Sequence, residues 1–388
     1  FSGDLVLSKA ESKFDDLKGD VAGAAVSGAL AFGEQNRLTG SIELGSLSAA
    51  ALFGLVLGPP EPVKAGSPWP SLAFAPPAFD LPKTSVELTI RDMALPSALF
   101  PPGAVAKNAR MSVDTAPGVL ELRNLRLDIA GGAVSGEIEI RRAGVDASLA
   151  SRLDFSDIAL DLPAVRGRIS GSIEAAGTGK SAEALAAGLA GSGHAAIAGL
   201  TIPGADPAAL GRVLAAVDKD GQTPSAGEIA AALGRELKRA DFKAGSCALD
   251  VAIAAGTLQL SAPGSASADD ALKVFFDLRR AILAQQLTFA VNAPPKDWSG
   301  PPPRIAVLIK GPLSAAPTVE IDAAALANGL AARAIAQESA RIESYEFDIH
   351  ERAFFYQRLL SERRREQERL SAAAEAAAGE QTTPRPPE

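Results

Sequence analysis

Long stretches of this 388-residue chain alternate apolar and polar residues, the pattern of a β-strand with one apolar face. The alternation is clearest over residues 131–162 and 165–179, and earlier copies cover residues 19–47 and 85–95. Glycine or an Asp-containing turn separates the strands at roughly 8–12 residues, as is typical of antiparallel strands in series. The pattern predicts a mainly β fold: an elongated, curved antiparallel sheet whose apolar face forms a groove.

Within single strands, the alternation gives one parity to a set of aliphatic side chains. The candidates for lining the groove are Val134, Ile138, Ile140, Ile169 and Ile173. Parity places such side chains on one face only within each strand, so the sequence leaves open which face points inward.

Two places along the β region need a separate interpretation. At Asn124 the parity of the leucines in residues 120–129 shifts, which predicts a bulge or a turn. Residues 272–291 contain Leu, Arg, Ala and Gln, which also favour helix. We interpret them as a strand hairpin because their neighbours are strands.

Composition and periodicity predict how the chain is organised. The expected parts are N-terminal strands of a larger sheet (1–58), a proline-rich linker (59–82), the β-groove region (83–322), a C-terminal helix (323–376) and a disordered tail (377–388). The prolines exclude a central strand from the linker. We expect its aromatic residues Trp69, Phe74 and Phe79 to pack it onto the sheet rather than to bind a ligand.

A helical insert is predicted at 180–240, where the period changes. Ser181 is the expected N-cap of a first helix, and Asp206 followed by Pro207 that of a second. A further helix carries its apolar stripe at Ile229, Leu233 and Leu237.

The C-terminal helix is highly charged and carries a near-heptad apolar stripe. The stripe is formed by Ile335, Ile342, Tyr345, Ile349, Tyr356 and Leu360. The arginine-rich residues 363–369 give the helix a basic end. Contact with anionic lipid or with a partner helix is one interpretation, and a solvated helix whose stripe packs on the sheet is the other. We favour solvation for the charges and partner packing for Tyr345, Phe354 and Phe355.

The composition narrows the classes of function. The formal net charge of −8 argues against a nucleic-acid partner. The one cysteine, Cys247, excludes an intramolecular disulfide and a zinc site built on several thiolates. Aromatic residues make up only 5% of the chain, so a core of small aliphatic residues in thin layers is expected. The longest apolar run, residues 49–58, is shorter than the roughly 20 residues of a membrane-spanning helix.

Candidate chemistry is sparse. Residues 175–181 (AAGTGKS) resemble part of a phosphate-binding loop, but Glu174 stands where that loop needs its first glycine. His194 and His350 are the only histidines, too few for a three-histidine metal site. A pairing of Cys247 with a histidine is not marked by any motif, and no G-x-S-x-G sequence occurs. The acid pairs 154/157 and 269/270 fall at predicted turns. We expect no cofactor, no metal and no enzymatic activity.

A family resemblance rests on residues 132–214. A strand and a GTG turn (177–179) lead into a helix with the exit LAGSG (189–193), and Gly204 and Asp206 hold later positions. This series resembles the C-terminal region of AsmA-family proteins, with Pro207 departing from a usual leucine. The end of the chain, from Glu338 to Leu370, resembles the tails of AsmA proteins from alphaproteobacteria.

This resemblance implies a periplasmic protein anchored in the inner membrane by a helix upstream of the present chain, which begins in the middle of a strand. AsmA-like proteins are similar to bridge-like lipid transfer proteins, in which a curved sheet carries phospholipid acyl chains between the inner and outer membranes and supports outer-membrane biogenesis. The implied partners are phospholipid acyl chains, the two membranes and an envelope protein bound through the C-terminal helix. Two alternatives stay open: a module that assists outer-membrane protein assembly without carrying lipid, and an adhesin-like β repeat with a closed, filled interior.

Overall fold

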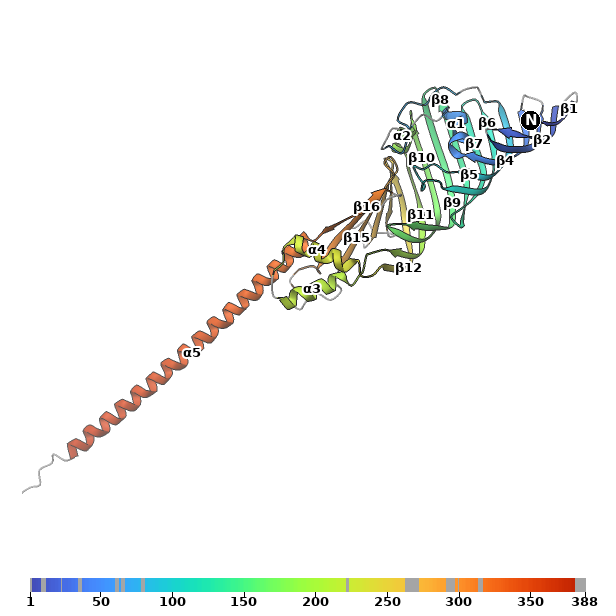
Figure 1. Ribbon diagram of the computed structural model, residues 1–388. Helices are drawn as coiled ribbons and strands as arrows, with labels where there is room; N and C mark the ends of the chain where they lie inside the picture. Colours follow the sequence, from blue (N-terminus) through green and yellow to red (C-terminus); the bar gives the residue numbers. More distant parts are fainter. Residues whose placement is uncertain are drawn as a thin grey trace, which may run out of the picture.

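The computed structural model describes residues 2–7, 12–21, 23–33, 37–59, 63, 67–77, 81–220, 223–261, 272–290, 297–298, 300–312 and 317–380. The protein is mainly β, with one long, curved, open sheet and a long C-terminal helix, as the alternating pattern predicts (Figure 1). Over the described residues the sheet is open and does not close on itself.

In the part of the chain that the structure describes, seventeen strands form the sheet, and each pairs with its neighbours in sequence order. They are β1 (Ser2–Leu7), β2 (Ser12–Val21), β3 (Ala24–Phe32), β4 (Arg37–Ser48), β5 (Lys83–Ala94), β6 (Val105–Ala116), β7 (Val119–Ile129), β8 (Gly132–Ala143), β9 (Asp146–Leu162), β10 (Val165–Gly179), β11 (Ala190–Ile202), β12 (Phe242–Ala254), β13 (Thr257–Ser261), β14 (Leu272–Asp277), β15 (Ile282–Ala290), β16 (Arg304–Pro312) and β17 (Thr318–Asp322). The antiparallel pairing of β14 with β15 confirms the predicted hairpin.

One pair departs from the antiparallel arrangement that the sequence predicts. Strands β4 and β5 run parallel, in register from Arg37 opposite Lys83 to Ser48 opposite Ala94. Parallel neighbours require a crossover that returns the chain to the starting end of the first strand. Here the crossover is helix α1 (Ala49–Leu57) followed by the proline-rich segment, which is too long for a hairpin turn.

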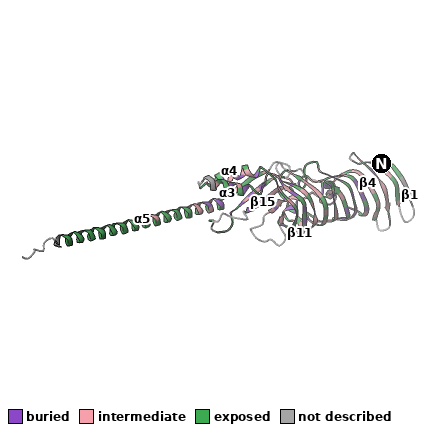
Figure 2. Ribbon diagram, turned by 90° about the horizontal axis from the view of Figure 1, so that it is seen from below, coloured by how far each residue is buried: buried purple, intermediate pink, exposed green. Residues whose placement is uncertain are grey.

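Bulges curve the sheet. The shift predicted at Asn124 is confirmed: the register of β7 against β8 slips between Leu122 and Leu125, and Asn124 has a φ of 50°. A second slip lies in the β9–β10 pair, where Asp157 has a φ of 57°. An extra residue in one strand bends that strand and increases its twist. Repeated bulges therefore give the sheet the curl seen in Figures 1 and 2.

The helices of the insert are α2 (Ala182–Ala187), α3 (Ala209–Asp220) and α4 (Ala226–Leu237). Ser181 is the N-cap of α2, as predicted, and accepts a hydrogen bond from the N–H of Ala184. The prediction for Asp206 is wrong in position. Its carboxylate accepts the N–H of Ala208 at 2.9 Å and closes a turn, so α3 begins only at Ala209.

Helix α5 (Ala324–Glu380) runs away from the sheet (Figure 1). It continues past the predicted end at residue 376, because residues 371–378 (SAAAEAAA) have high helix propensity. The remainder of the predicted tail, residues 381–388, lies outside the described residues.

The proline-rich segment lies across the ends of interior strands of the sheet, and it packs there at Trp69 and Phe74, as predicted. We call its described part, residues 67–77, the strap. The indole N–H of Trp69 donates to the carbonyl of Leu278 at 2.6 Å, and the N–H of Phe74 donates to the carbonyl of Lys180 at 2.8 Å. Phe79 lies outside the described residues.

Two hydrophobic clusters form the core, both on one face of the sheet. In the first, Ala49, Leu52 and Val56 of α1 pack on strands β5 to β8. In the second, α3, α4 and the first turns of α5 pack on the ends of β11, β12, β15 and β16. The predicted stripe of α4, formed by Ile229, Leu233 and Leu237, is buried in this second cluster. Figure 2 shows the buried residues concentrated in the sheet, whereas most of α5 is exposed.

Candidate functional site

One line of apolar residues crosses the sheet from β2 to β16. In each strand the member of this line lies directly opposite its neighbours, so all its side chains are on one face. We call it the apolar row. It consists of Phe14, Leu30, Gly40, Val86, Val113, Leu122, Ile138, Ser151, Ala175, Gly191, Ile253, Leu258, Phe276, Leu283 and Gly311.

The apolar row contains no charged residue and one hydroxyl. The hydroxyl of Ser151 donates to the carbonyl of Ala175 at 3.3 Å, so it is satisfied within the sheet. At about 4.8 Å between strands, the row is about 65–70 Å long. Since both hydrophobic clusters lie on this face, we call it the inner face of the sheet.

The five candidates from the sequence all lie on the inner face. Ile138 belongs to the apolar row itself. Ile173 lies two residues before the row member Ala175 on β10, opposite Leu153. Val134 is opposite Phe155, Ile140 opposite Leu149, and Ile169 opposite Ile158. Strand register therefore brings together residues that sequence parity could relate only within each strand.

Helices cover the inner face unevenly. Under α1, Ile140 is buried to 1% exposure. Val134, Ile138 and Ile173, on neighbouring parts of β8 and β10, are only half-buried. The helices therefore leave the stretch of inner face over β8–β10, between the two clusters, only partly covered, and we call this stretch the trough.

Small residues form the floor of this trough where β10 meets β11. Gly171, Gly177, Gly191 and Gly193 share the inner face with Ala175. A Cβ added at Gly193 would run into the carbonyl oxygen of Ser172 on the neighbouring strand, so this close approach requires glycine. The floor leaves space that larger side chains would fill. Sequence reasoning missed these residues, because a glycine in a strand carries no hydrophobic signal.

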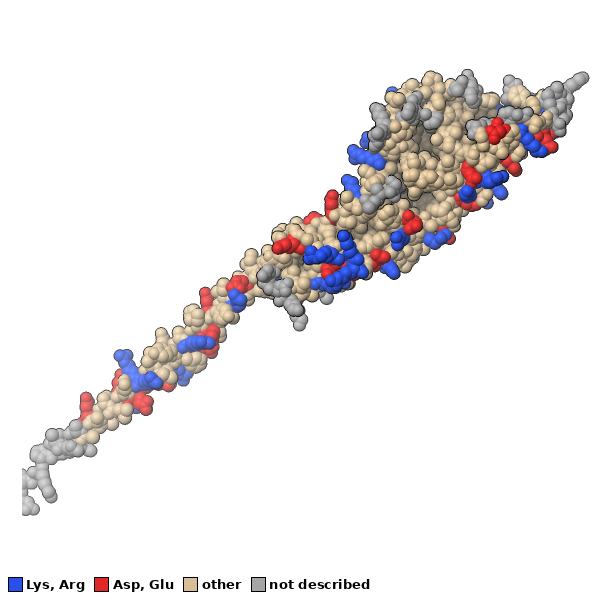
Figure 3. Space-filling view, in the orientation of Figure 1, with Lys and Arg blue, Asp and Glu red and all other residues tan. Residues whose placement is uncertain are grey.

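The outer face has the opposite character and carries ladders of ion pairs. Arg152 donates to Glu174 at 2.8 Å, and Arg166 lies 3.5 Å from Asp161. The hydrogen bond from Arg168 holds the pKa of Asp157 below its usual value. In Figure 3 the charged side chains gather along one side of the sheet region and along α5, whereas the hollowed part shows few of them. An open hollow of about 560 Å³ is lined by charged side chains of this face, such as Arg152 and Glu174, and also by members of the apolar row: Leu122, Ile138, Ser151, Ala175 and Gly191.

Arg142, at the end of β8, connects α1 and the strap to the sheet beside the trough; we call α1 and the strap together the cover. Its guanidinium donates to the carbonyls of Leu57 at 2.7 Å, Phe74 at 3.0 Å and Ala75 at 2.6 Å. The first of these carbonyls ends α1 and the others belong to the strap. A cation near the carboxyl end of a helix is favourable, so one side chain holds both α1 and the strap in place.

The candidates for nucleophilic chemistry are kept apart. Cys247 lies opposite Ile197 on the inner face, where partial burial raises the pKa of its thiol. His194 is exposed on the outer face, opposite Ser172 and Asp250. A Cys247–His194 pair is thus excluded by the strand register. The Ser172 hydroxyl lies 3.1 Å from Nδ1 of His194, between two paired strands on the outer face.

The remaining motifs have structural roles. Residues 175–181 contain the end of β10 and the N-cap of α2. These structural roles account for the glycines and for Ser181, so no phosphate-binding role is needed to explain them. His350 is exposed on α5 and donates through Nδ1 to the carbonyl of Glu346 at 2.7 Å. Asp269 and Asp270 lie outside the described residues. Within the described ranges, no group of three or more His, Cys, Asp or Glu residues could hold a metal ion.

Comparison of the chain with family models, with curated proteins and with solved structures gives no match. Among the described residues, no helix combines the length and the apolar character needed to cross a membrane.

Proposed function

We propose that the inner face of this sheet holds phospholipid acyl chains and conducts them along the apolar row. The protein would act without catalysis as the periplasmic part of an inner-membrane-anchored, AsmA-like protein that supports outer-membrane biogenesis. The observation that carries this proposal is the row itself: a line of apolar positions without a charged residue, only partly covered over β8–β10.

The chemistry of the trough favours an acyl chain as its ligand. Each methylene group removed from water contributes about 0.8 kcal/mol, so a chain lying along even a few strands gains several kcal/mol. No charged group in the apolar row fixes the position of such a chain, which can therefore slide. The small residues on the trough floor of β10 and β11 leave space for an acyl chain. The ion pairs of the outer face keep that face exposed to water.

The test is native mass spectrometry and lipid extraction on the purified protein, followed by loading with a fluorescent phospholipid. Ile138→Asp and Ile173→Asp place a charge in the trough and should reduce loading. The matched controls, Ala133→Asp and Ala176→Asp, add the same charge to exposed outer-face positions of β8 and β10 and should load normally.

Ala175→Phe is a second, uncharged trough variant, which tests the proposal if the buried charge of an Asp variant disturbs folding. It fills the floor of the trough with an apolar side chain and should also reduce loading. Folded trough variants that load as well as their controls would contradict the proposal. A lipid-free protein that also fails to load would favour the module that assists outer-membrane protein assembly without carrying lipid.

A further inference from the structure

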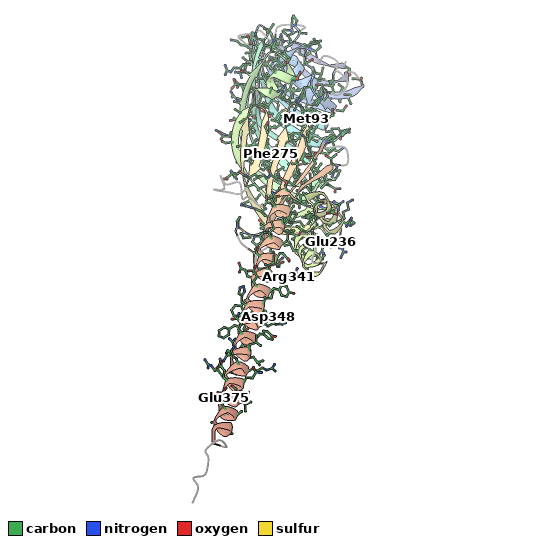
Figure 4. All side chains as sticks on the ribbon, turned by 90° about the vertical axis from the view of Figure 1, so that its left-hand side faces the viewer. Met93, Glu236, Phe275, Arg341, Asp348 and Glu375 are labelled. Atoms are coloured by element: carbon green, nitrogen blue, oxygen red, sulfur yellow. The ribbon has the colours of Figure 1, made fainter. Side chains whose placement is uncertain are left out.

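Most of helix α5 projects from the sheet (Figures 1 and 4), yet it carries many exposed large apolar residues. Its first turns are anchored: Leu326 and Leu330 are buried, and Arg333 donates to Asp297 at 2.8 Å. The predicted stripe does not pack on the sheet. Its members Ile335, Ile342, Tyr345, Ile349, Tyr356 and Leu360 are 47–69% exposed. Such a row of exposed large apolar side chains needs a partner.

The spacing of the stripe fits a coiled coil. Ile335, Ile342, Ile349 and Tyr356 are each seven residues apart. Of the positions three residues after each of them, Tyr345 and Leu359 are apolar, and Glu338 and Arg352 are charged. A strict seven-residue repeat on an α-helix drifts by about 20° per heptad and so follows a left-handed superhelix. The partner that fits this stripe is therefore another long helix.

The charges along the free part of α5 indicate which helix this is. Residues 338–351 contain five carboxylates and one arginine, whereas residues 352–369 contain six arginines and three carboxylates. Two copies running parallel would place like charges together. Two copies running antiparallel place the acidic half of each against the basic half of the other.

We propose that α5 pairs with the α5 of a second copy of this chain as an antiparallel coiled coil centred between His350 and Glu351. In this register Ile342 meets Leu359 of the second copy, and Tyr345 meets its Tyr356. Glu338 meets its Arg363, and Arg341 flanks its Glu362. Each contact occurs twice because of the twofold axis.

The base of α5 has room for the end of the second helix. An open groove of about 710 Å³ lies between Thr223 and residues 331–341 of α5. In the proposed register these residues face residues 360–370 of the second copy, so Leu370 would lie against Ala331. The two sheets end up at opposite ends of the shared helix pair. Phe347 and Phe354 remain outside, on the far side of the helix.

Sedimentation equilibrium on the full chain tests the pairing. The wild-type protein should be a dimer, and Arg363→Glu should raise the dimer dissociation constant about tenfold or more by placing like charges together. Adding Glu338→Arg to that variant should restore the affinity, because only the antiparallel register joins these two positions. Phe347→Ser with Phe354→Ser is the matched control. It removes exposed apolar area from the far face and should leave the dissociation constant unchanged.

Cross-linking tests the direction independently, in a Cys247→Ser background. Ile342→Cys chains mixed with Leu359→Cys chains should form a disulfide-linked dimer, whereas neither variant should cross-link alone. The two copies of residue 342 would be about 25 Å apart along the pair, far beyond the reach of a disulfide. A monomeric wild-type protein, self-cross-linking of Ile342→Cys, or failure of the double charge reversal to restore dimerisation would overturn the proposal.

Discussion

Ile138 and Ile140 are the same residue type, two positions apart on one strand and one face, yet their surroundings differ. Ile140 is fully buried under α1 in the first cluster. Ile138 is half-buried at the margin of the trough. The strand pattern makes both apolar, but only a helix laid over the sheet turns an apolar position into core. Under the proposed function, the uncovered part is where an acyl chain takes the place of the helix.

The largest expected effect is on the covered side. Ile140→Ala should lower the free energy of unfolding by about 2–5 kcal/mol, because it leaves a cavity in a closed cluster. Ile138→Ala is the matched control and should cost about 1 kcal/mol, since less area is buried at a half-exposed site. Urea unfolding followed by circular dichroism measures both. Equal losses would mean that the trough is covered like the cluster.

The next largest effect on stability is expected at Arg142, which holds α1 and the strap on the sheet. Arg142→Ala removes charged hydrogen bonds to the end of α1 and to the strap, and should cost about 2 kcal/mol. Arg141→Ala, on the same strand, removes only an exposed pair with Glu139 and should cost less than about 1 kcal/mol. If Arg142 acts as a clamp, its variant should also bind more of a hydrophobic dye than the Arg141 variant does. An equal small loss for both would contradict the clamp.

The fold could be predicted well because the sheet is built from local signals. Alternation gave the strands, Asn124 marked a bulge, and the stripe Ile229, Leu233 and Leu237 marked a buried helix. The parallel pair β4–β5 could not be predicted, because α1 and the strap form a crossover whose path depends on tertiary contacts such as those of Arg142. Local sequence also placed the start of α3 too early, since the carboxylate of Asp206 serves a turn and Arg212.

The candidate site was only partly predictable. Val134, Ile138, Ile140, Ile169 and Ile173 could be named from parity within strands, but their common face required the register between strands. Gly191, Gly193 and Ala175 were missed, because what they contribute is space. The strap and its anchors arise between residues far apart in the chain, as with Trp69 and Leu278.

A smaller effect, an increase in the free energy of unfolding, is expected at Gln285 of β15, beside the second cluster. Gln285 is 1% exposed and lies between Val274 and Ile309, and its side-chain oxygen has no hydrogen-bond partner among the described residues. A buried, unsatisfied amide oxygen destabilises the fold. Gln285→Met keeps the volume and should raise the free energy of unfolding by about 1 kcal/mol. Gln286→Met, directed to the other face, is the matched control and should change it little. A loss for Gln285→Met would show that the amide is satisfied.

The smallest expected effect is a pH dependence of stability at Asp206, which precedes α3, one of the helices packed on the second cluster. Hydrogen bonds from Arg212, at 2.6 Å, and from the N–H of Ala208 hold the pKa of Asp206 below its ordinary value of 3.8. The ionised carboxylate therefore stabilises the fold fully above about pH 4, and this contribution is lost as the pH falls through the lowered pKa.

Asp206→Asn should lower the thermal midpoint at about pH 7, and the difference from wild type should shrink at a pH below the lowered pKa, where the wild-type carboxyl also loses its charge. Asp161→Asn removes an exposed carboxylate from the outer face and should leave the midpoint nearly unchanged at both values. Because Arg212 also bonds Glu236 at the end of α4, the loss should appear first as exposure of the apolar surface beneath α3 and α4. A difference between Asp206→Asn and wild type that does not change with pH would mean that Asp206 acts through the turn it closes, and not through its charge.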